Sequence, residues 1–551
     1  MTSWNRGLAA VVAASALGLG CAGEGAPSRE GSRSRAVEAV SGGTAVVGVA
    51  RGATTLLPPL AQTSLDAELG GMLYLGLNLA EWGREGLSYS ASSPRALADR
   101  WSFSADSAAL TYHLAVGRRW SDGEPIRAAD VVFTYRLLAD TSLALPLGSV
   151  TDELDSVFVR DDSTVTFQFR RPYPGMLFDT GVGILPEHVF GSGDPRRLRE
   201  HPALRHPEGG ALVVSGPFRV ESWAPDDRIV LVRNEQSAVI AHLDRLVFRI
   251  LPEETTRLAA LRAGDLDVAQ LVSFRQAARL SAEGVYRIVR IPQRGYDYIA
   301  WNPGAVTAFR HRRVRRALSL AIDRRAIIAA LEMGEFAEPA TGPYGSLFPD
   351  LRPDVESASF DPAEARRLLD SAGWEDTDGD GIREKGPEEL SFTLTTDAGN
   401  ERRASAAQIV QAQLARVGVR AEIRLQEFRS LFQRLLARDY EAAMLGWQVG
   451  LDPDISPFWA DSESPLNVVG YHDPEVSAVI RQARDAASAE EAAIFWRRAA
   501  ERIATDYPYA FLWYFDLLYA VAPRLHEVRT SVLGLTQGVE RWWIPPGARR
   551  R

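Results

Sequence analysis

One stretch of the chain changes its hydrophobic periodicity twice, which few folds accommodate. Residues 390–395 alternate apolar and polar side chains, as a strand with one buried face does. Residues 404–417 then place apolar side chains three and four apart, as on one face of a helix, and Gly418 ends that pattern. Residues 419–425 return to alternation. A strand, a helix and a second strand in this order predict a crossover between parallel strands, and therefore an α/β fold.

A second unit of the same kind lies earlier in the chain. Residues 246–250 predict a strand, residues 254–263 a helix, and Gly264 its C-cap, with a further strand from residue 267. Residues 314–323 carry the apolar face of another helix. Such units predict right-handed crossovers in a mixed α/β sheet.

Residues 112–169 have a more strand-rich pattern. Asp122-Gly123, within Trp120-Ser121-Asp122-Gly123, suits a tight turn, and a helix is expected to open at Asp130. The whole pattern predicts two α/β lobes and a smaller strand-rich insert.

Length and charge limit the remaining possibilities. A chain of 551 residues is too long for one core and predicts two to four domains. Its net charge of -9 is small for this length, which argues against nucleic acid and against a polybasic membrane patch. After the N-terminal region, no segment is long and apolar enough to span a bilayer.

The N-terminus resembles a bacterial lipoprotein signal. Arg6 precedes an apolar run from Leu8 to Gly20, which ends at Cys21, the only cysteine. The resemblance implies that residues 1–21 are a signal and that Cys21 is lipidated, with simple secretion as the alternative. Gly18 stands where a lipobox usually has Leu. Residues 22–43 are rich in Gly and Ser and predict a flexible tether.

Several further segments follow one another in an order typical of one protein family. These segments are TAVVGVARGATTLLPPL from Thr44, PRALADRWSFSADSAALTYHLAVGRRWSDGEPIRAADVVFTYRLLAD from Pro94, ILPEHVF from Ile184, SGPFRVESW from Ser215, YDYIAWNP from Tyr296 and LGWQVGLDPD from Leu445. With these segments in this order, the chain resembles bacterial solute-binding proteins of family 5, the peptide/nickel class that serves ABC importers.

The resemblance implies a two-lobed periplasmic-binding-protein fold of class II with an extra strand-rich domain. Lobe I would comprise residues 44–76, 213–293 and 512–551, the extra domain residues 77–212, and lobe II residues 294–511. The lobes of such a protein close around a solute and release it unaltered. The resemblance implies that this protein is an extracytoplasmic monomer that has no cofactor and is not an enzyme. Its expected partners are a peptide-like or other medium-sized organic solute and the permease subunits of an importer, with a lipid as its only membrane contact.

In the family, a Gly-Trp pair and a later Asp-Pro pair line the ligand cleft. Here these are Gly446-Trp447 and Asp452-Pro453. Peptide-binding members place an Asp three residues after the Trp to hold the ligand's amino group, and this chain has Gly450 there. Trp447, Gly450 and Asp452 are therefore candidate ligand residues. The alternatives are core packing for Trp447 and loop bracing for Asp452.

Three further candidates come from the same resemblance. Arg403 matches a family Arg at a helix start, where a guanidinium fork holds a carboxylate or phosphate, with an interlobe ion pair or a solvated side chain as the alternative. Tyr296 and Trp301 lie on a strand that faces the cleft in the family. Alternation places Tyr296 and Tyr298 on one face of this strand and Trp301 on the other.

A short acidic stretch resembles the first half of a calcium loop. Asp376, Asp378 and Asp380 stand at positions 1, 3 and 5, before Gly381. Position 12, where a Glu is expected, is Pro387. We favour a plain Asp/Gly turn over a calcium site.

Other function classes have less support. A ligand-presenting sensory module would share the fold of a transport protein. A nickel-type chelate carrier is disfavoured because the eight histidines are scattered. A secreted hydrolase would need a carboxylate pair that sequence alone cannot bring together, and no HExxH, GxSxG or P-loop motif is present.

Overall fold

The computed structural model describes residues 39–83, 86–292, 294–345, 347–355, 359–460, 464–486 and 488–550. Cys21, the rest of the predicted signal and most of the predicted tether lie outside these residues.

A mixed sheet of twelve strands organises most of the described chain. Its main path runs β18-β17-β19-β13-β20-β11-β1-β10-β9-β8, and β12 and β14 pair with β20 beside this path. The strands are β1 (Thr44–Val49), β8 (Phe218–Ala224), β9 (Arg228–Arg233), β10 (Arg245–Ile250), β11 (Val268–Leu271), β12 (Arg287–Pro292), β13 (Gly295–Trp301), β14 (Ala337–Pro339), β17 (Ser391–Asp397), β18 (Arg420–Gln426), β19 (Ala442–Gln448) and β20 (Tyr509–Val521).

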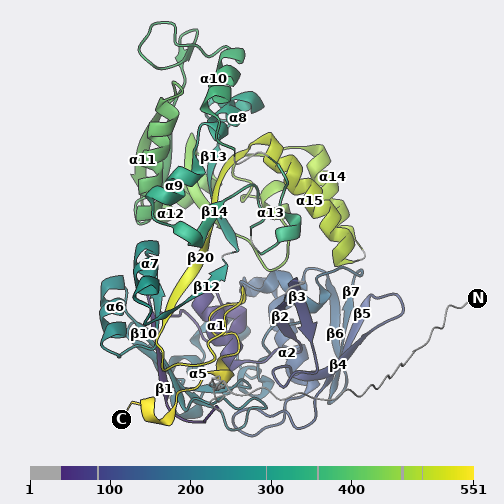
Figure 1. Ribbon diagram of the computed structural model, residues 1–551. Helices are drawn as coiled ribbons and strands as arrows, with labels where there is room; N and C mark the ends of the chain where they lie inside the picture. The colour runs from purple at the N-terminus through teal and green to yellow at the C-terminus, as the bar shows by residue number, and fades with distance from the viewer. Residues whose placement is uncertain are drawn as a thin grey trace, which may run out of the picture. The chain divides into compact units, whose positions relative to one another are not determined.

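The long strand β20 belongs to both halves of this sheet. Its first half pairs with β13 and β14, and its second half pairs with β11 and β12. Figure 1 shows it as one continuous yellow strand. Residues 515–517 in its middle are only partly buried, whereas the residues on either side are buried. The halves are therefore joined by an unbroken strand with a less packed centre.

Both predicted strand-helix-strand units are present. β17 and β18 pair in parallel and are joined by α11 (Glu401–Ala415). This helix begins before residue 404 because the Asn400 side chain caps it, accepting a hydrogen bond from the Arg403 N–H at 3.1 Å. β10 and β11 are joined by α6 (Glu254–Arg262) and both pair in parallel with β1, which lies between them. The prediction of an α/β fold is confirmed.

The helix predicted at 314–323 begins and ends earlier than expected. α8 spans Arg312–Leu320, and a new helix, α9, spans Arg324–Ala330. The break occurs because the Asp323 side chain accepts the Ala326 N–H at 2.9 Å and so serves as the N-cap of α9.

The other helices lie between strands or follow one another without an intervening strand. They are α1 (Ser64–Leu73), α2 (Ala128–Ala139), α3 (Met176–Asp179), α4 (Glu187–Phe190), α5 (Pro202–Arg205), α7 (Phe274–Glu283), α10 (Pro362–Ser371), α12 (Phe428–Leu436), α13 (Ser456–Trp459), α14 (Pro474–Asp485) and α15 (Ala489–Asp506).

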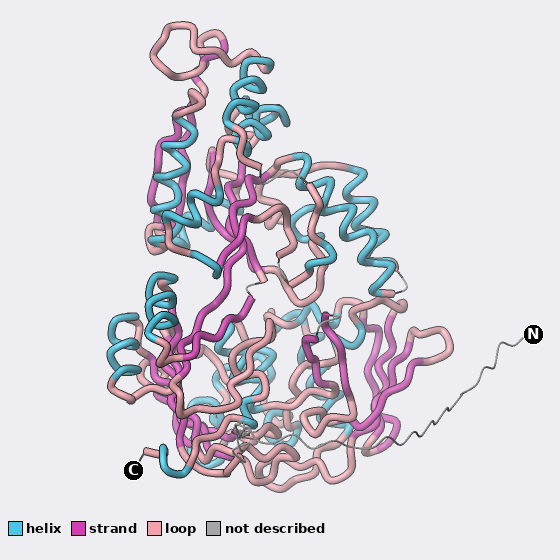
Figure 2. The backbone as a smooth tube through the Cα atoms, viewed as in Figure 1, coloured by secondary structure: helices cyan, strands magenta, loops and turns pink. Residues whose placement is uncertain are grey.

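The strand-rich insert forms a separate antiparallel sheet of four strands, ordered β4-β5-β7-β6. Figure 2 shows these strands apart from the large sheet. Two short hairpins, β2-β3 and β15-β16, lie outside both sheets. The strands are β4 (Ala98–Phe103), β5 (Ala109–Leu114), β6 (Leu154–Asp161), β7 (Thr164–Phe169), β2 (Leu79–Gly83), β3 (Gly86–Ser90), β15 (Glu384–Lys385) and β16 (Glu388–Glu389).

The Trp-Ser-Asp-Gly segment fixes the entry to α2. Gly123 has a φ of +94°, which confirms the predicted turn. Helix α2 begins two residues before the predicted Asp130, because the Asp130 carboxylate reaches back to the Arg127 N–H at 2.8 Å. The same carboxylate accepts the buried Trp120 Nε1–H at 3.3 Å. This segment of the family signature therefore has a structural role.

The hydrophobic cores do not follow the predicted domain boundaries. One core joins buried residues of the predicted lobe I with those of residues 77–212. A second joins residues 258–280 with buried residues of β13, β19 and β20, and a third lies within residues 296–514. The boundaries at 76/77, 212/213, 293/294 and 511/512 stay a prediction. Among the described residues, no helix has the length and apolar character that crossing a membrane requires.

Candidate ligand-binding site

The predicted site residues gather around the strand pair β13-β19. The two strands are antiparallel, and Tyr296 stands opposite Trp447. Tyr296, Tyr298 and Trp447 belong to one hydrophobic core, whereas Trp301 belongs to another. The predicted division of this strand into two faces is therefore confirmed.

Trp447 is packed against other aromatic rings. Its ring stacks on Tyr298 with centroids 5.8 Å apart and an interplanar angle of 18°, and it also contacts Phe458. Its Nε1–H donates to the Tyr509 hydroxyl at 3.3 Å. With 8% of its surface exposed, Trp447 forms part of a rigid aromatic layer. Tyr296 lies in the same layer, 5.2 Å from the ring of Phe511.

Trp301 lies in the core on the opposite face of β13. Its ring is fully buried and contacts Phe309 and Phe392, with centroids 5.2 Å and 5.8 Å away. In this conformation the Trp301 side chain contributes to the hydrophobic core on that face of the sheet.

Arg403 is engaged by a carboxylate of the chain itself. Its guanidinium donates to Asp297 Oδ1 at 2.7 Å, and Arg402 reaches Asp297 Oδ2 at 3.1 Å. The Trp513 Nε1–H donates to the same Oδ2 at 3.1 Å. Burial alone would raise the pKa of Asp297, but the two guanidinium groups hold this pKa below its usual range. The carboxylate beside Arg403 is thus an internal one.

This ion cluster explains the Gly of the Gly-Trp pair. A Cβ at Gly446 would lie 2.3 Å from Asp297 Oδ1 and 2.4 Å from Arg403 Nη2. No side chain fits at that position while the cluster is intact. Sequence reasoning missed Asp297, although an acidic residue inside the otherwise apolar strand YDYIAW was the available signal.

The loop after β19 carries the accessible candidates. Gly450 and Asp452 are both exposed. Asp452 accepts the Asp454 N–H at 2.9 Å. This bond braces the loop, which is the alternative role considered for Asp452 from the sequence. The Tyr344 hydroxyl donates to the Pro453 carbonyl at 2.5 Å. Surrounding protein raises the pKa of Asp452 even though solvent reaches its side chain.

Residues of the strand-rich insert meet this loop. Asp452 Oδ2 lies 3.6 Å from the position that a Cβ on Gly175 would occupy. Nearby, the Tyr173 hydroxyl donates to Asp179 Oδ2 at 2.5 Å. Burial, followed by the negative charge of Asp452, raises the pKa of Asp179 to about 7. Two carboxyl groups from distant parts of the chain therefore lie at one interface.

Two more contacts hold the same interface. Arg171 donates to Asp485 Oδ1 at 2.5 Å while also pairing with Glu153 at 3.1 Å. The ring of Trp82, in hairpin β2-β3, lies edge-on to Phe348 with centroids 6.4 Å apart. The predicted extra domain and the predicted lobe II are thus in direct contact.

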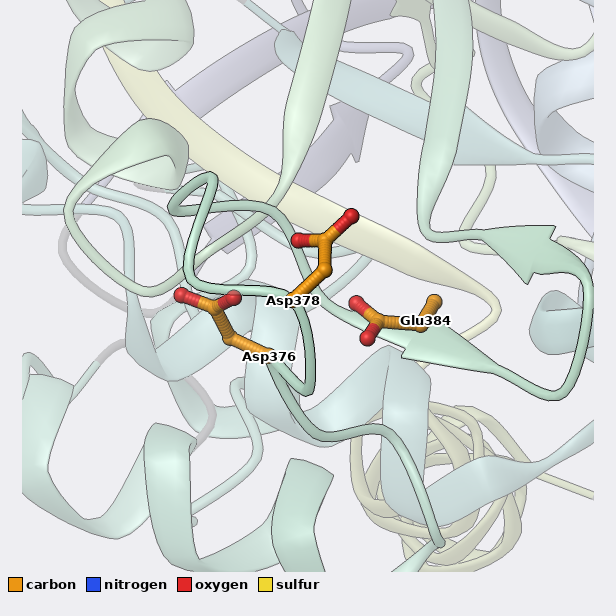
Figure 3. A group of neighbouring side chains, drawn as sticks. All are labelled: Asp376, Asp378 and Glu384. Carbon is orange, nitrogen blue, oxygen red and sulfur yellow. The ribbon is translucent and has the colours of Figure 1, made fainter.

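The calcium-like loop has a different acidic grouping from the one predicted. Asp376 and Asp378 lie close to Glu384, with one carboxylate oxygen from each within 4.8 Å of the others (Figure 3). Asp380 instead accepts the Ile382 N–H at 2.7 Å. Asp376 accepts the Gly379 N–H at 2.8 Å, as in the predicted Asp/Gly turn. A calcium site at this loop stays the less favoured alternative to that turn.

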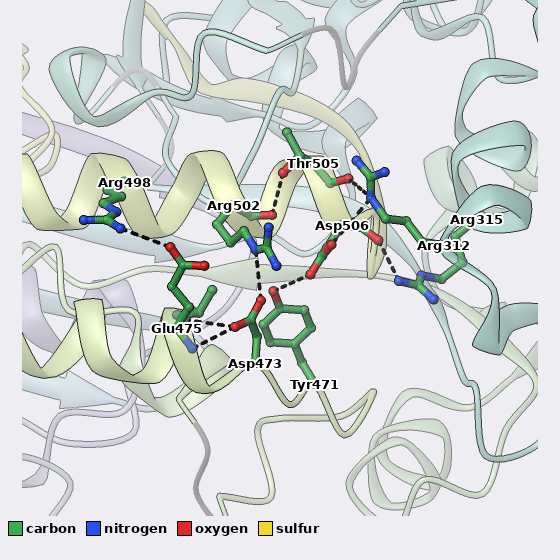
Figure 4. Close-up of polar contacts among 10 residues, drawn as sticks. Arg312, Arg315, Tyr471, Asp473, Glu475, Arg498, Arg502, Thr505 and Asp506 are labelled. Carbon is green, nitrogen blue, oxygen red and sulfur yellow. Dashed lines mark hydrogen bonds and ion pairs between the residues drawn. The ribbon is translucent and has the colours of Figure 1, made fainter.

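A polar network outside the site joins α14 and α15 to α8 (Figure 4). Arg502 pairs with Asp473 at 2.9 Å, and the Tyr471 hydroxyl donates to Asp506 at 2.9 Å. Arg312 lies 3.5 Å from Asp506. The carboxylates of Asp473 and Asp506 each have a hydrogen-bond donor, so we assign this network to helix packing.

Comparison with known proteins identifies the family. The profile of bacterial extracellular solute-binding proteins, family 5 middle, matches residues 94–465. The chain belongs to this family.

Relatives and solved structures cover most of the chain. The oligopeptide-binding protein AppA of Bacillus subtilis (strain 168) is 28% identical over 449 residues, which are 79% of this chain and 81% of AppA. The structure of B. subtilis AppA in complex with a nonapeptide matches with a TM-score of 0.75 and 26% identity, covering 92% of this chain and 100% of that one. NikA from Brucella suis in complex with Fe(III)-EDTA has the same fold at 20% identity, with a TM-score of 0.78 and coverage of 91% and 100%.

These matches confirm the predicted periplasmic-binding-protein fold and its functional class. The protein is an extracellular solute-binding protein of the kind that serves ABC importers. Its family consists of substrate-binding proteins of transporters, not of enzymes.

Proposed function

We propose that this protein captures a peptide-like solute outside the cytoplasm and delivers it unaltered to the permease of an ABC importer. The observation that carries the proposal is the match to AppA holding a nonapeptide, which extends over 92% of this chain. The solute class is transferred from that relative.

We place the solute between the loop Gly450–Asp454 and the insert residues near Gly175. Support comes from the exposure of Gly450 and Asp452 and from the proximity of Asp452 to Gly175. Tyr296 and Trp447 would form the aromatic floor of this site, because they lie on the β13-β19 face from which the loop departs. Trp301 and Arg403 would hold the floor in place from its other face.

The remaining parts of the proposal concern the whole chain. Lipidation at Cys21 would anchor the protein to a membrane, and residues 22–43 would act as a tether. The protein would act as a monomer and catalyse nothing, since cleft closure alone accounts for capture and release.

The experiment begins with protein purified without added solute. Mass spectrometry of molecules released on denaturation identifies any retained solute, and defined peptide pools are then tested by thermal unfolding. Retained or added peptide should raise the Tm, because a ligand that binds only the folded state stabilises it.

A substitution that blocks the loop tests the location. A Cβ at Gly450 would meet only Asp452 backbone atoms at 3.6 Å, so Gly450→Phe should fold and obstruct the solute. Gly193→Phe is the matched control, because Gly193 is exposed and has no atom within 4 Å of its Cβ position. The peptide-induced rise in Tm should disappear only in Gly450→Phe. Peptides recovered with altered masses would contradict a non-enzymatic role.

A further inference from the structure

Arg294 occupies a fixed position beside the proposed aromatic floor. It stands immediately before β13, and its carbonyl oxygen accepts the Val449 N–H at 2.8 Å, which extends the β13-β19 ladder by one step. The two strands approach closely there, because a Cβ on the adjacent Gly295 would lie 2.1 Å from the Trp447 carbonyl oxygen.

Strand alternation indicates the direction of the Arg294 side chain. Successive side chains of a strand point to opposite faces, so residues 294, 296 and 298 share one face. Tyr296 and Tyr298 lie in the core that contains Trp447. Arg294 therefore projects from the edge of the aromatic layer, next to the strand end that leads into Gly450–Asp454.

The guanidinium of Arg294 is partly buried and has no partner in the part of the chain that the structure describes. Among the described residues, no hydrogen bond or ion pair from its side chain is present, and burial alone lowers its pKa. A partly desolvated cation without a partner is energetically unfavourable.

Other arginines whose pKa is lowered by burial are compensated. Arg257 donates to the carbonyls of Leu251, Pro252 and Gln270. Arg324 donates to Phe511, Ser319 and Ile322. Each of these two guanidinium groups therefore has several carbonyl acceptors, whereas Arg294, beside the proposed site, has none among the described residues.

We propose that Arg294 is a specificity-determining residue that pairs with an anionic group of the captured solute, most simply a carboxylate. This inference rests on the proposed function and deepens it. A carboxylate would supply the charged hydrogen-bond acceptors that the guanidinium lacks. Arg403 is not free for this role, because it is bound to Asp297.

The test uses full-length protein and two matched peptide pools. In the first pool the C-terminal carboxylate is the only carboxylate of each peptide, and in the second that group is an amide. Wild type should bind the acid pool about tenfold or more tightly, as expected for loss of a charge-assisted hydrogen bond. In Arg294→Gln this preference should fall to near one. Arg294→Lys should keep part of it, because it keeps the charge without the fork.

A control separates recognition from structural damage. Arg316→Gln removes another partly exposed Arg that has no partner among the described residues. Without peptide, Arg294→Gln should unfold at the same Tm as Arg316→Gln or higher. A clearly lower Tm would reveal a structural partner and overturn the inference.

The binding outcomes distinguish the two levels of the proposal. Equal binding of both pools by wild type, or an acid preference that persists in Arg294→Gln, would overturn the role of Arg294 while the proposed function stands. If wild type binds neither pool, the proposed function fails for peptides and the inference falls with it.

Discussion

The arginine side chains near strand β13 differ in whether the protein supplies them with a carboxylate. On one face, Arg402 and Arg403 surround the buried Asp297, and every charge has a partner. Arg294, which stands immediately before β13, is partly buried but has no partner among the described residues. The first arrangement is complete without a solute. The comparison teaches that a match to a family motif does not make an Arg available, since availability depends on which carboxylates the fold has placed nearby.

The largest effect is expected from breaking the paired cluster. Asp297→Asn keeps the shape but removes the buried negative charge that two partly buried guanidinium groups share, which should cost about 3–5 kcal/mol of unfolding free energy. Urea unfolding with an unchanged m-value would measure it. A loss below about 1 kcal/mol would mean that the cluster is no more structural than Arg294.

A smaller loss should follow from crowding the same cluster. Gly446→Ala would place a Cβ 2.3 Å from Asp297 Oδ1, and displacing the ion pair should cost about 1–3 kcal/mol. Gly450→Ala, in the exposed loop, is the control and should leave stability nearly unchanged. Equal midpoint urea concentrations for the two variants would contradict the conclusion that the ion cluster requires a glycine at position 446.

Asp179 extends the comparison to carboxylates: unlike Asp297, it has no cationic partner among the described residues. Its pKa of about 7 lies above the ordinary value of an aspartate, so the folded state binds more protons than the unfolded state between about pH 4 and pH 7. Stability contributed by this group should therefore fall as pH rises through that window, by up to about 1.4 kcal/mol per pH unit.

The measurement compares unfolding free energies of wild type and Asp179→Asn across the same pH range. The slope assigned to Asp179 should vanish in the variant, while a change at an exposed aspartate elsewhere, such as Asp226→Asn, should keep it. An unchanged slope in Asp179→Asn would show that other groups set the pH dependence.

The smallest effect is expected at an exposed pair. Arg245 and Glu221 lie 2.5 Å apart, but their side chains are 51% and 40% exposed. Glu221→Gln should change stability by less than about 1 kcal/mol, because water screens the interaction. A loss of unfolding free energy comparable to that of Asp297→Asn would show that burial does not explain why the Asp297 cluster contributes more than an exposed pair.

The sequence predicted the fold well wherever local periodicity decides it. The crossover through α11, the glycine ends at Gly264 and Gly418 and the turn at Gly123 all follow from backbone preference and apolar spacing. The predicted helix at 314–323 extended too far along the chain because Asp323 caps the next helix, which an apolar pattern does not reveal.

The site could be predicted only in part. Collinear motifs located β13 and β19, and alternation divided Tyr296 from Trp301. The motif could not indicate that Arg403 is occupied, because its partner Asp297 lies more than a hundred residues away. The Asp179–Asp452 interface likewise joins distant segments. Ligand contacts at Trp447, Gly450 and Asp452 stay predictions.

The continuity of β20 has a mechanical consequence. Residues 518–521 pair with strands on both sides, whereas residues 515–517 pair on one side only and are less buried, so β20 can bend or twist there with fewer contacts to disturb. Repeated opening and shutting would then be elastic, and amide exchange should stay slow along both ends of the strand while its midpoint exchanges faster.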